Sequence, residues 1–111
     1  MESPLQITYR GFTHQPELEA IIRKRAEDLD KVAGHRLTSC HVVVELGHEH
    51  FPGARIFHVK VDVTFAGAVV VIDRERHDDR THEDATVAVH DAFDAARRKL
   101  EHVDRQRHAA T

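Results

Sequence analysis

Apolar and polar residues alternate along several short stretches of this chain, the pattern of β-strands that bury one face. In the clearest stretch, 57–65, every second residue is Val or Phe, and the residues between them are polar. A shorter stretch, 5–10, alternates Leu, Ile and Tyr with Gln, Thr and Arg. Residues 37–46 have the same period, and 68–72 are an unbroken run of Ala, Val and Ile, a composition that favours strands. Four strands are therefore predicted in these ranges.

Two further segments have the period of an amphipathic helix. Between Pro16 and Val32, apolar residues recur every three or four positions, and a leading Pro followed by two Glu residues is typical of a helix N-terminus. A second helix is predicted from about Glu83 to His108, where an apolar stripe beginning at Val89 has spacings of 4, 3, 4 and 3 residues. Each helix has one narrow apolar stripe, so each can pack against one layer only.

The remaining segments are expected to be loops. Residues 47–54, GHEHFPGA, are rich in Gly and Pro and lie between two predicted strands, which indicates a hairpin loop. Residues 73–81, DRERHDDRT, are polar throughout and are expected to form an exposed loop. The first helix should connect parallel neighbouring strands by a right-handed crossover, and the later strands should pair as hairpins.

The resulting element order is β-α-β-β-β-α. It predicts the α+β fold class, with a four-stranded sheet and both helices packed on one face. A chain of 111 residues is long enough for one hydrophobic core and too short for two. We therefore expect a single domain over residues 1–111, with its core at about 5–108.

Composition limits the classes of protein to which the chain can belong. Hydrophobic residues make up 41% and charged residues 32%, which is typical of an ordered globular domain. The one cysteine, Cys40, cannot form an internal disulfide, as suits a reducing compartment. No signal peptide is recognisable, and no apolar run approaches the roughly 20 residues needed to cross a bilayer. A cytoplasmic location without a membrane partner is expected.

The formal charge is −3 with all eleven histidines neutral. This balance argues against bulk attraction to nucleic acid, so any such contact would depend on local basic clusters. Protonation of the histidines would make the charge less negative near neutral pH, so affinity for RNA should rise as pH falls.

Two clusters of titratable residues are candidate chemical sites. The sequence His48-Glu49-His50, with His58 on the next strand, contains imidazoles that suit a transition metal, but its spacing matches no closed four-ligand pattern. The acidic and histidine-rich segment 77–84 could form a hydrolytic centre, yet acidic residues there also suit the start of a helix. The polar-loop interpretation is favoured for both, and neither an enzyme activity nor a cofactor is expected.

Four segments together resemble one known family. They are the strand LQITYRGF, the helix PELEAIIRKRAEDLDKV, the strand CHVVVEL and the segment HEDATVAVHDAFDAARRKL. Their order and spacing resemble the ribosome hibernation promoting factor and ribosome-associated translation inhibitor family, also described as sigma-54 modulation proteins. The resemblance extends over about residues 5–108, and the triplet HED at 82–84 belongs to its most specific part.

The resemblance implies a fold similar to a double-stranded RNA binding domain and a non-catalytic role. Members bind the small ribosomal subunit between its head and body, where messenger and transfer RNA lie, and thereby block translation. The implied partner is ribosomal RNA (rRNA), with no small-molecule substrate. Because no long extension follows the last helix, the chain resembles a short-form member, which we expect to be a monomer off the ribosome.

Family members carry basic residues on the facing surfaces of the two helices. Arg25, Lys31 and Arg98 match that pattern, whereas Asp28 and Ala95 occupy positions where the family often has Lys. Such side chains would neutralise phosphates and release counterions. With neighbouring basic residues included, the side chains expected to bind rRNA are Arg23, Lys24, Arg25, Lys31, Arg97, Arg98, Lys99, His102 and Arg105.

A second hypothesis is a divergent relative that has lost the ribosomal site and acts as a protein-interaction or regulatory module. The acidic balance and the two departures from the family pattern favour it. On this hypothesis the basic residues are ordinary solvated helix faces with ion pairs four residues apart, such as Asp94 with Arg98 and Glu27 with Lys31.

Overall fold

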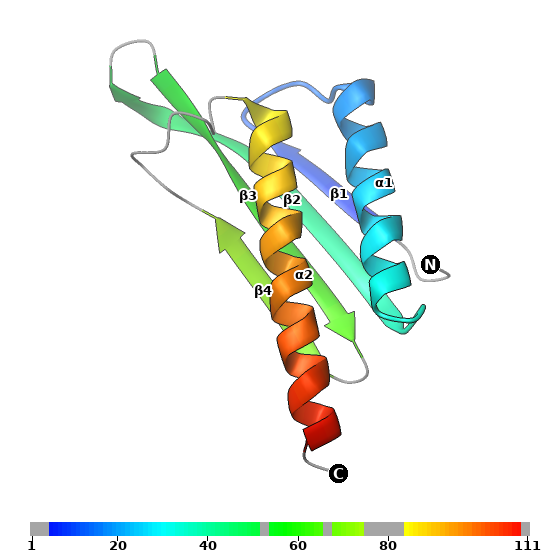
Figure 1. Cartoon of the computed structure of the whole chain (residues 1–111). Helices are drawn as coiled ribbons and strands as arrows, with labels where there is room; N and C mark the ends of the chain where they lie inside the picture. The colour runs from blue at the N-terminus through cyan, green and yellow to red at the C-terminus, as the bar shows by residue number, and fades with distance from the viewer. Residues whose placement is uncertain (1–4, 52–53, 66–67, 75–83, 110–111) are drawn as a thin grey trace.

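The computed structural model describes residues 5–51, 54–65, 68–74 and 84–109. In chain order the elements are β1 (Leu5–Arg10), α1 (Pro16–Val32), β2 (Leu37–Phe51), β3 (Ala54–Phe65), β4 (Ala68–Arg74) and α2 (Ala85–Ala109). The strands form one sheet in the order β1-β2-β3-β4 (Figure 1). β1 runs parallel to β2, and the other two neighbouring pairs are antiparallel.

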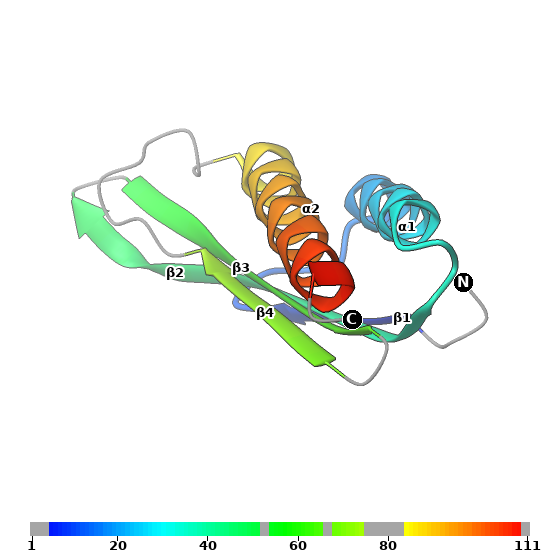
Figure 2. The same cartoon turned by 60° about the horizontal axis from the view of Figure 1, so that its bottom comes forward.

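Both helices cover the same face of the sheet (Figure 2). α2 packs on β3 and β4, and α1 lies beside α2, in contact with β1 and β2. The predicted α+β class, the β-α-β-β-β-α order and the placement of both helices on one face are therefore confirmed. The likeness to a double-stranded RNA binding domain and the single-domain extent over 1–111 stay predictions.

The hydrophobic core fills the layer between the sheet and the helices. In β3, Val59, Val61, Val63 and Phe65 are buried as the alternation predicted, while Phe57 is partly buried at the end of the core. The helical stripes contribute the other half of the layer. Their fully buried side chains come from Leu18, Ile22, Ala26 and Leu29 of α1 and from Val89, Phe93, Ala96 and Leu100 of α2.

The predicted hairpin between β2 and β3 is confirmed, but its expected loop at 47–54 is too long. β2 continues to Phe51 and β3 begins at Ala54, so most of that segment is strand. Shifts of register between Leu46 and Glu49, and again between Glu49 and Phe51, break the alternation from which strands are recognised in a sequence. β4 likewise extends to Arg74, so residues 73 and 74 of the expected loop belong to a strand, and the rest of that segment lies outside the described residues.

The turn from α1 into β2 is fixed by Asp30, whose side chain is only 1% exposed. The Leu37 amide donates to Asp30 Oδ1 at 3.3 Å, and His35 Nδ1 lies 3.2 Å from Oδ2. Burial by itself raises the pKa of Asp30, but the hydrogen bonds that it accepts, these two among them, hold it below its ordinary value. Gly34 and His35 both have left-handed backbone angles here, with φ of 64° and 62°.

Candidate nucleic-acid interface

The nine side chains expected to contact rRNA lie on α1 and α2, which run side by side over the sheet (Figure 1). Six of them form two runs of three consecutive residues, 23–25 and 97–99. Consecutive residues of an α-helix are rotated by about 100° around its axis, so each run points in three directions. Helix geometry therefore divides the nine side chains among different surfaces instead of gathering them in one cluster.

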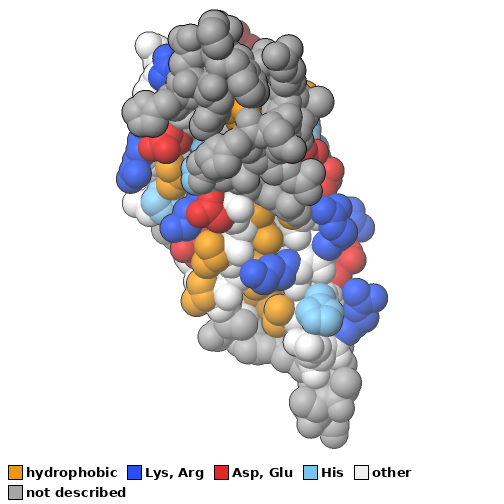
Figure 3. Space-filling view, turned by 90° about the vertical axis from the view of Figure 1, so that its left-hand side faces the viewer, with side chains coloured by type: hydrophobic (Ala, Val, Ile, Leu, Met, Phe, Trp, Pro, Cys, Tyr) orange, Lys and Arg blue, Asp and Glu red, His pale blue; other side chains and the backbone are white. Residues whose placement is uncertain are grey.

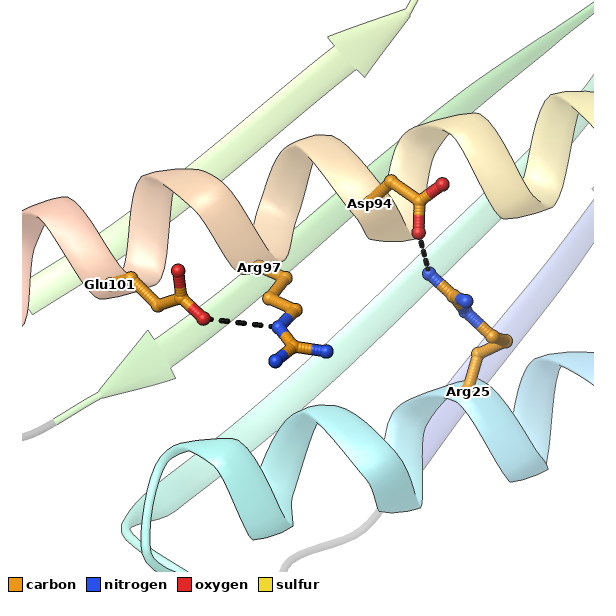
Figure 4. A network of polar contacts seen from close by, with 4 residues as sticks. All are labelled: Arg25, Asp94, Arg97 and Glu101. Atoms are coloured by element: carbon orange, nitrogen blue, oxygen red, sulfur yellow. Dashed lines mark hydrogen bonds and ion pairs between the residues drawn. The ribbon is translucent and has the colours of Figure 1, made fainter.

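Arg25 points from α1 toward α2 and is paired with a carboxylate there. Its Nη2 lies 2.5 Å from Asp94 Oδ1 (Figure 4). The guanidinium carbon also lies 5.8 Å from the centroid of the Phe93 ring, near the outer limit of a cation–π contact. The side chain of Arg25 is 26% exposed and that of Asp94 is 53% exposed. The pair thus links the two helices at a partly buried position.

Arg97 borders the same groove between the helices. Its Nε donates to Glu101 Oε1 at 3.0 Å, one turn further along α2 (Figure 4). The groove is a hollow of about 90 Å³ lined by Arg25, Asp28, Leu29, Val32, Phe93, Asp94 and Arg97. Two arginines and two aspartates in this lining give a formal charge of zero (2 − 2). This inter-helix groove is therefore electrically balanced by side chains of the chain itself.

The other two basic residues of the first run also meet carboxylates of α1. Arg23 Nη2 lies 3.4 Å from Glu19 Oε1, and Lys24 Nζ lies 3.2 Å from Asp28 Oδ1. These are exposed pairs four residues apart, of the kind that the second hypothesis expected. The pairs Asp94–Arg98 and Glu27–Lys31 named for that hypothesis are absent from the ion pairs of the described residues.

The remaining basic residues lie on outer surfaces. Lys31, Arg98, His102 and Arg105 are exposed, and among the described residues none of the four has an ion-pair partner. Lys99 points toward the edge of the sheet, where its Nζ donates to the carbonyl oxygen of Val71 in β4 at 3.1 Å. Seen from the β4 side, basic side chains and a histidine gather toward the C-terminal end of α2 (Figure 3).

Sequence reasoning missed the role of Asp94. No local spacing reveals it, because Arg25 and Asp94 are 69 residues apart and meet only when the helices pack. The Arg97–Glu101 contact was within reach of sequence reasoning, since it has the four-residue spacing of helical ion pairs. Ala95, noted as a missing lysine, is 4% exposed and belongs to the core layer.

The residues weighed for other chemistry give no second site in the part of the chain that the structure describes. The side chains of 48–50 and the segment 77–83 lie outside the described residues, and His58 is hydrogen-bonded to Asp73. Among the described residues, no group of three or more His, Cys, Asp or Glu could hold a metal ion. Asp84 Oδ1 accepts a hydrogen bond from the Thr86 amide at 2.8 Å, which confirms that it stabilises the start of a helix.

Cys40 is buried in the sheet, 1% exposed. Burial, and after it the nearby negative charge of Asp62, raises the pKa of its thiol to about 12. A thiol with so high a pKa is a poor nucleophile near neutral pH, so Cys40 has the properties of a small core residue.

None of the described helices is long and apolar enough to span a membrane.

Comparison with known proteins gives matches among solved structures and none among curated sequences. A search of curated proteins finds no match. A ribosomal subunit interface protein from Coxiella burnetii superposes with a TM-score of 0.66 and 16% identity, over 90% of this chain and 96% of that one. The N-terminal domain of Protein Y from Thermus thermophilus gives a TM-score of 0.66 and 17% identity, over 93% of this chain and 99% of that one.

At these identities the two structures show a shared fold. The family model for the Sigma 54 modulation protein / S30EA ribosomal protein family matches residues 5–108, the same range over which the segment pattern resembles that family. The match covers nearly all of the chain, including both helices and the groove between them. The chain therefore belongs to the Sigma 54 modulation protein / S30EA ribosomal protein family.

Proposed function

We propose that this protein binds the small ribosomal subunit through phosphates of its rRNA and blocks translation under stress by filling the channel between head and body. Membership of a family described as ribosomal supports association with the ribosome. The matched ribosomal subunit interface protein supports the same broad assignment. The proposed mechanism is steric and electrostatic and involves no bond making or breaking.

The observation that carries the proposal is the outer basic row, which we define as Lys31, Arg98, His102 and Arg105. These side chains are exposed on the two helices and have no carboxylate partner among the described residues. Arg98 and Arg105 are seven residues apart on α2, two helical turns, and so point in nearly the same direction. Exposed cations without carboxylate partners can contact phosphates without reading a base sequence.

Co-sedimentation with purified small subunits over a range of salt concentrations tests the proposal. The double variant Lys31→Gln/Arg98→Gln removes two charges from the helix side. Its matched control, Arg10→Gln/Lys60→Gln, removes two charges from exposed positions on β1 and β3. Loss of two phosphate contacts should weaken binding and lower the slope of log affinity against log salt by about 1 to 2. The control should bind like the wild type.

Equal binding by both double variants would contradict the assignment of the outer basic row. Failure of the wild-type chain to sediment with small subunits at low salt would contradict ribosome binding itself. Translation in a cell-free extract provides the functional arm: the wild type should inhibit protein synthesis in proportion to subunit occupancy, and Lys31→Gln/Arg98→Gln should inhibit less.

One observation favours the second hypothesis, a divergent member that acts as an interaction or regulatory module. Four of the nine side chains expected to bind rRNA, Arg23, Lys24, Arg25 and Arg97, are paired with carboxylates. On this hypothesis the wild type should not sediment with small subunits at low salt. Size-exclusion chromatography with light scattering of the protein alone tests the accompanying proposal that it is a monomeric single domain.

A further inference from the structure

Arg25, the more enclosed of the two arginines in the inter-helix groove, is already paired with a carboxylate, that of Asp94. Asp94 Oδ1 lies 2.5 Å from Arg25 Nη2, so the two charged groups are in direct hydrogen-bond contact. A phosphate oxygen of RNA would contact the guanidinium at a similar distance and with the same sign of charge. The carboxylate of Asp94 therefore occupies a position that a phosphate would need in order to bind this face of Arg25.

The contact is held from both helices. Phe93, 1% exposed, packs in the core, and its ring lies beside the guanidinium of Arg25. Asp94 follows Phe93 in the chain and is fixed by the same packed stretch of α2. Because Arg25 is partly buried and the side chain of Asp94 is short, less side-chain freedom is lost when the pair forms than in a pair of two long exposed side chains.

Neighbouring carboxylates extend the effect along the groove. Asp28 contributes to the lining opposite Asp94, and Glu101 is paired with Arg97 (Figure 4). A phosphate that entered the groove would meet the negative charges of Asp28 and Asp94 as well as the two arginines of the lining. In a partly desolvated site this repulsion is stronger than in water.

We propose that Asp94 is a built-in competitor of RNA phosphate for Arg25, and that it limits the affinity of the protein for the ribosome. The inference rests on the proposed function and assigns a regulatory part to the groove beside the outer basic row. Ribosome contacts are then made mainly by the outer basic row, while Arg25 serves to join α1 to α2. Any event that removed the charge of Asp94 would release Arg25 for a phosphate and strengthen binding.

The opposite role for Asp94 is also testable. Only Nη2 of Arg25 meets Asp94 in the structure, so the carboxylate could orient the guanidinium and leave its other N–H groups for a phosphate. In that case Asp94→Asn would weaken binding, whereas competition predicts that it strengthens binding. The sign of the change therefore separates the two roles.

The experiment compares the wild type with Asp94→Asn, Arg25→Gln and the double variant. Binding is measured to purified small subunits and to an RNA duplex of about 16 base pairs, the length that double-stranded RNA binding domains span. We expect Asp94→Asn to bind both probes about 3- to 10-fold more tightly, with a salt slope steeper by about 0.9. Arg25→Gln should change wild-type affinity by less than about twofold.

Glu27→Gln is the matched control for net charge. Glu27 is exposed on α1 and does not line the groove, so its replacement removes one negative charge outside the groove. In the Arg25→Gln background, the gain from Asp94→Asn should shrink to that of Glu27→Gln. Asp94→Glu, which keeps the charge, should retain wild-type affinity and shows whether the site tolerates substitution. Urea unfolding confirms that each variant is folded.

The inference is overturned if Asp94→Asn binds more weakly than the wild type, or if its gain in affinity is no larger than that of Glu27→Gln. It is also overturned if the gain is equally large in the Arg25→Gln background. If the wild type binds subunits in any of these cases, the proposed function is retained without the inference. If no variant binds subunits but Asp94→Asn binds the RNA duplex more tightly through Arg25, the competition between Asp94 and phosphate for Arg25 holds, whereas the proposed function and the limit on ribosome affinity both fail.

Discussion

The guanidinium of Arg36 lies 4.8 Å from the centroid of the Phe65 ring, where the turn after α1 meets the end of β3. The Nε of Arg36 donates to the carbonyl oxygen of Ala33 at 2.8 Å, and Nη2 lies 3.4 Å from Asp104 Oδ1 on α2. Phe65 is 1% exposed, so the arginine covers the last buried ring of β3. One side chain thus joins the turn, the sheet and the second helix.

Replacing Arg36 by Ala should lower the free energy of unfolding by about 1 kcal/mol, because a cation–π contact and a hydrogen bond to the backbone are lost together. Urea denaturation followed by circular dichroism measures the change. Arg36→Lys keeps the charge but loses the planar group that lies over Phe65, so it should recover only part of the stability. Full recovery with Lys would mean that charge alone matters at this position.

Asp30→Asn should destabilise the fold by about 1 to 3 kcal/mol at pH 7, because the buried carboxylate accepts hydrogen bonds that an amide satisfies only in part. The folded chain holds the pKa of Asp30 below its ordinary 3.8, so the charged form stabilises the fold above that value. This contribution is lost as pH falls through the folded pKa. Urea denaturation at several pH values should show the gap between wild type and variant closing below about pH 4.

The control for Asp30 is Glu27→Gln, an exposed carboxylate on the same helix. It should change stability little at any pH, as is usual for surface substitutions. A gap between wild type and Asp30→Asn that stays constant down to pH 3 would contradict the assignment of the pH-dependent stability to Asp30.

Gly11→Ala should destabilise the protein by more than about 1 kcal/mol, for both backbone and steric reasons. Gly11 has φ of 82°, and a Cβ there would lie 2.8 Å from the backbone oxygen of Leu46. Gly34 is the comparison: its φ is 64°, but a Cβ would meet only the flexible side chain of Arg36, no closer than 3.5 Å. Thermal unfolding should therefore place the midpoint of Gly11→Ala clearly below that of Gly34→Ala.

Cys40 should react very slowly with thiol reagents in the folded protein. With a pKa raised from 9.0 to about 12, about one thiol in ten thousand is ionised at pH 8, and burial blocks access as well. The rate with a chromogenic disulfide reagent should increase by several orders of magnitude when guanidinium chloride unfolds the chain. Rapid reaction of the native protein would show that β2 opens readily around Cys40.

Local patterns were sufficient for most elements of the fold. The alternation at 57–65 predicts the buried face of β3 because side chains of a strand alternate between its two faces. The stripe in 16–32 predicts α1 with its observed ends. The extension of β2 to Phe51 was not predictable in this way, since shifts of register change which residues share a face, and the paired partner strand stabilises residues with weak strand preference.

The candidate interface was only partly predictable, for a related reason. The sequence by itself determined which residues are basic, that they lie on two helices, and which family the order of segments resembles. Which basic side chains remain unpaired was decided by the tertiary structure. Packing α1 against α2 brings Asp94 to Arg25 across 69 residues of chain, and such a contact leaves no periodic trace in the sequence. The sequence gives the charge of each residue, whereas the electrostatic field at the surface of the protein depends on how the helices pack.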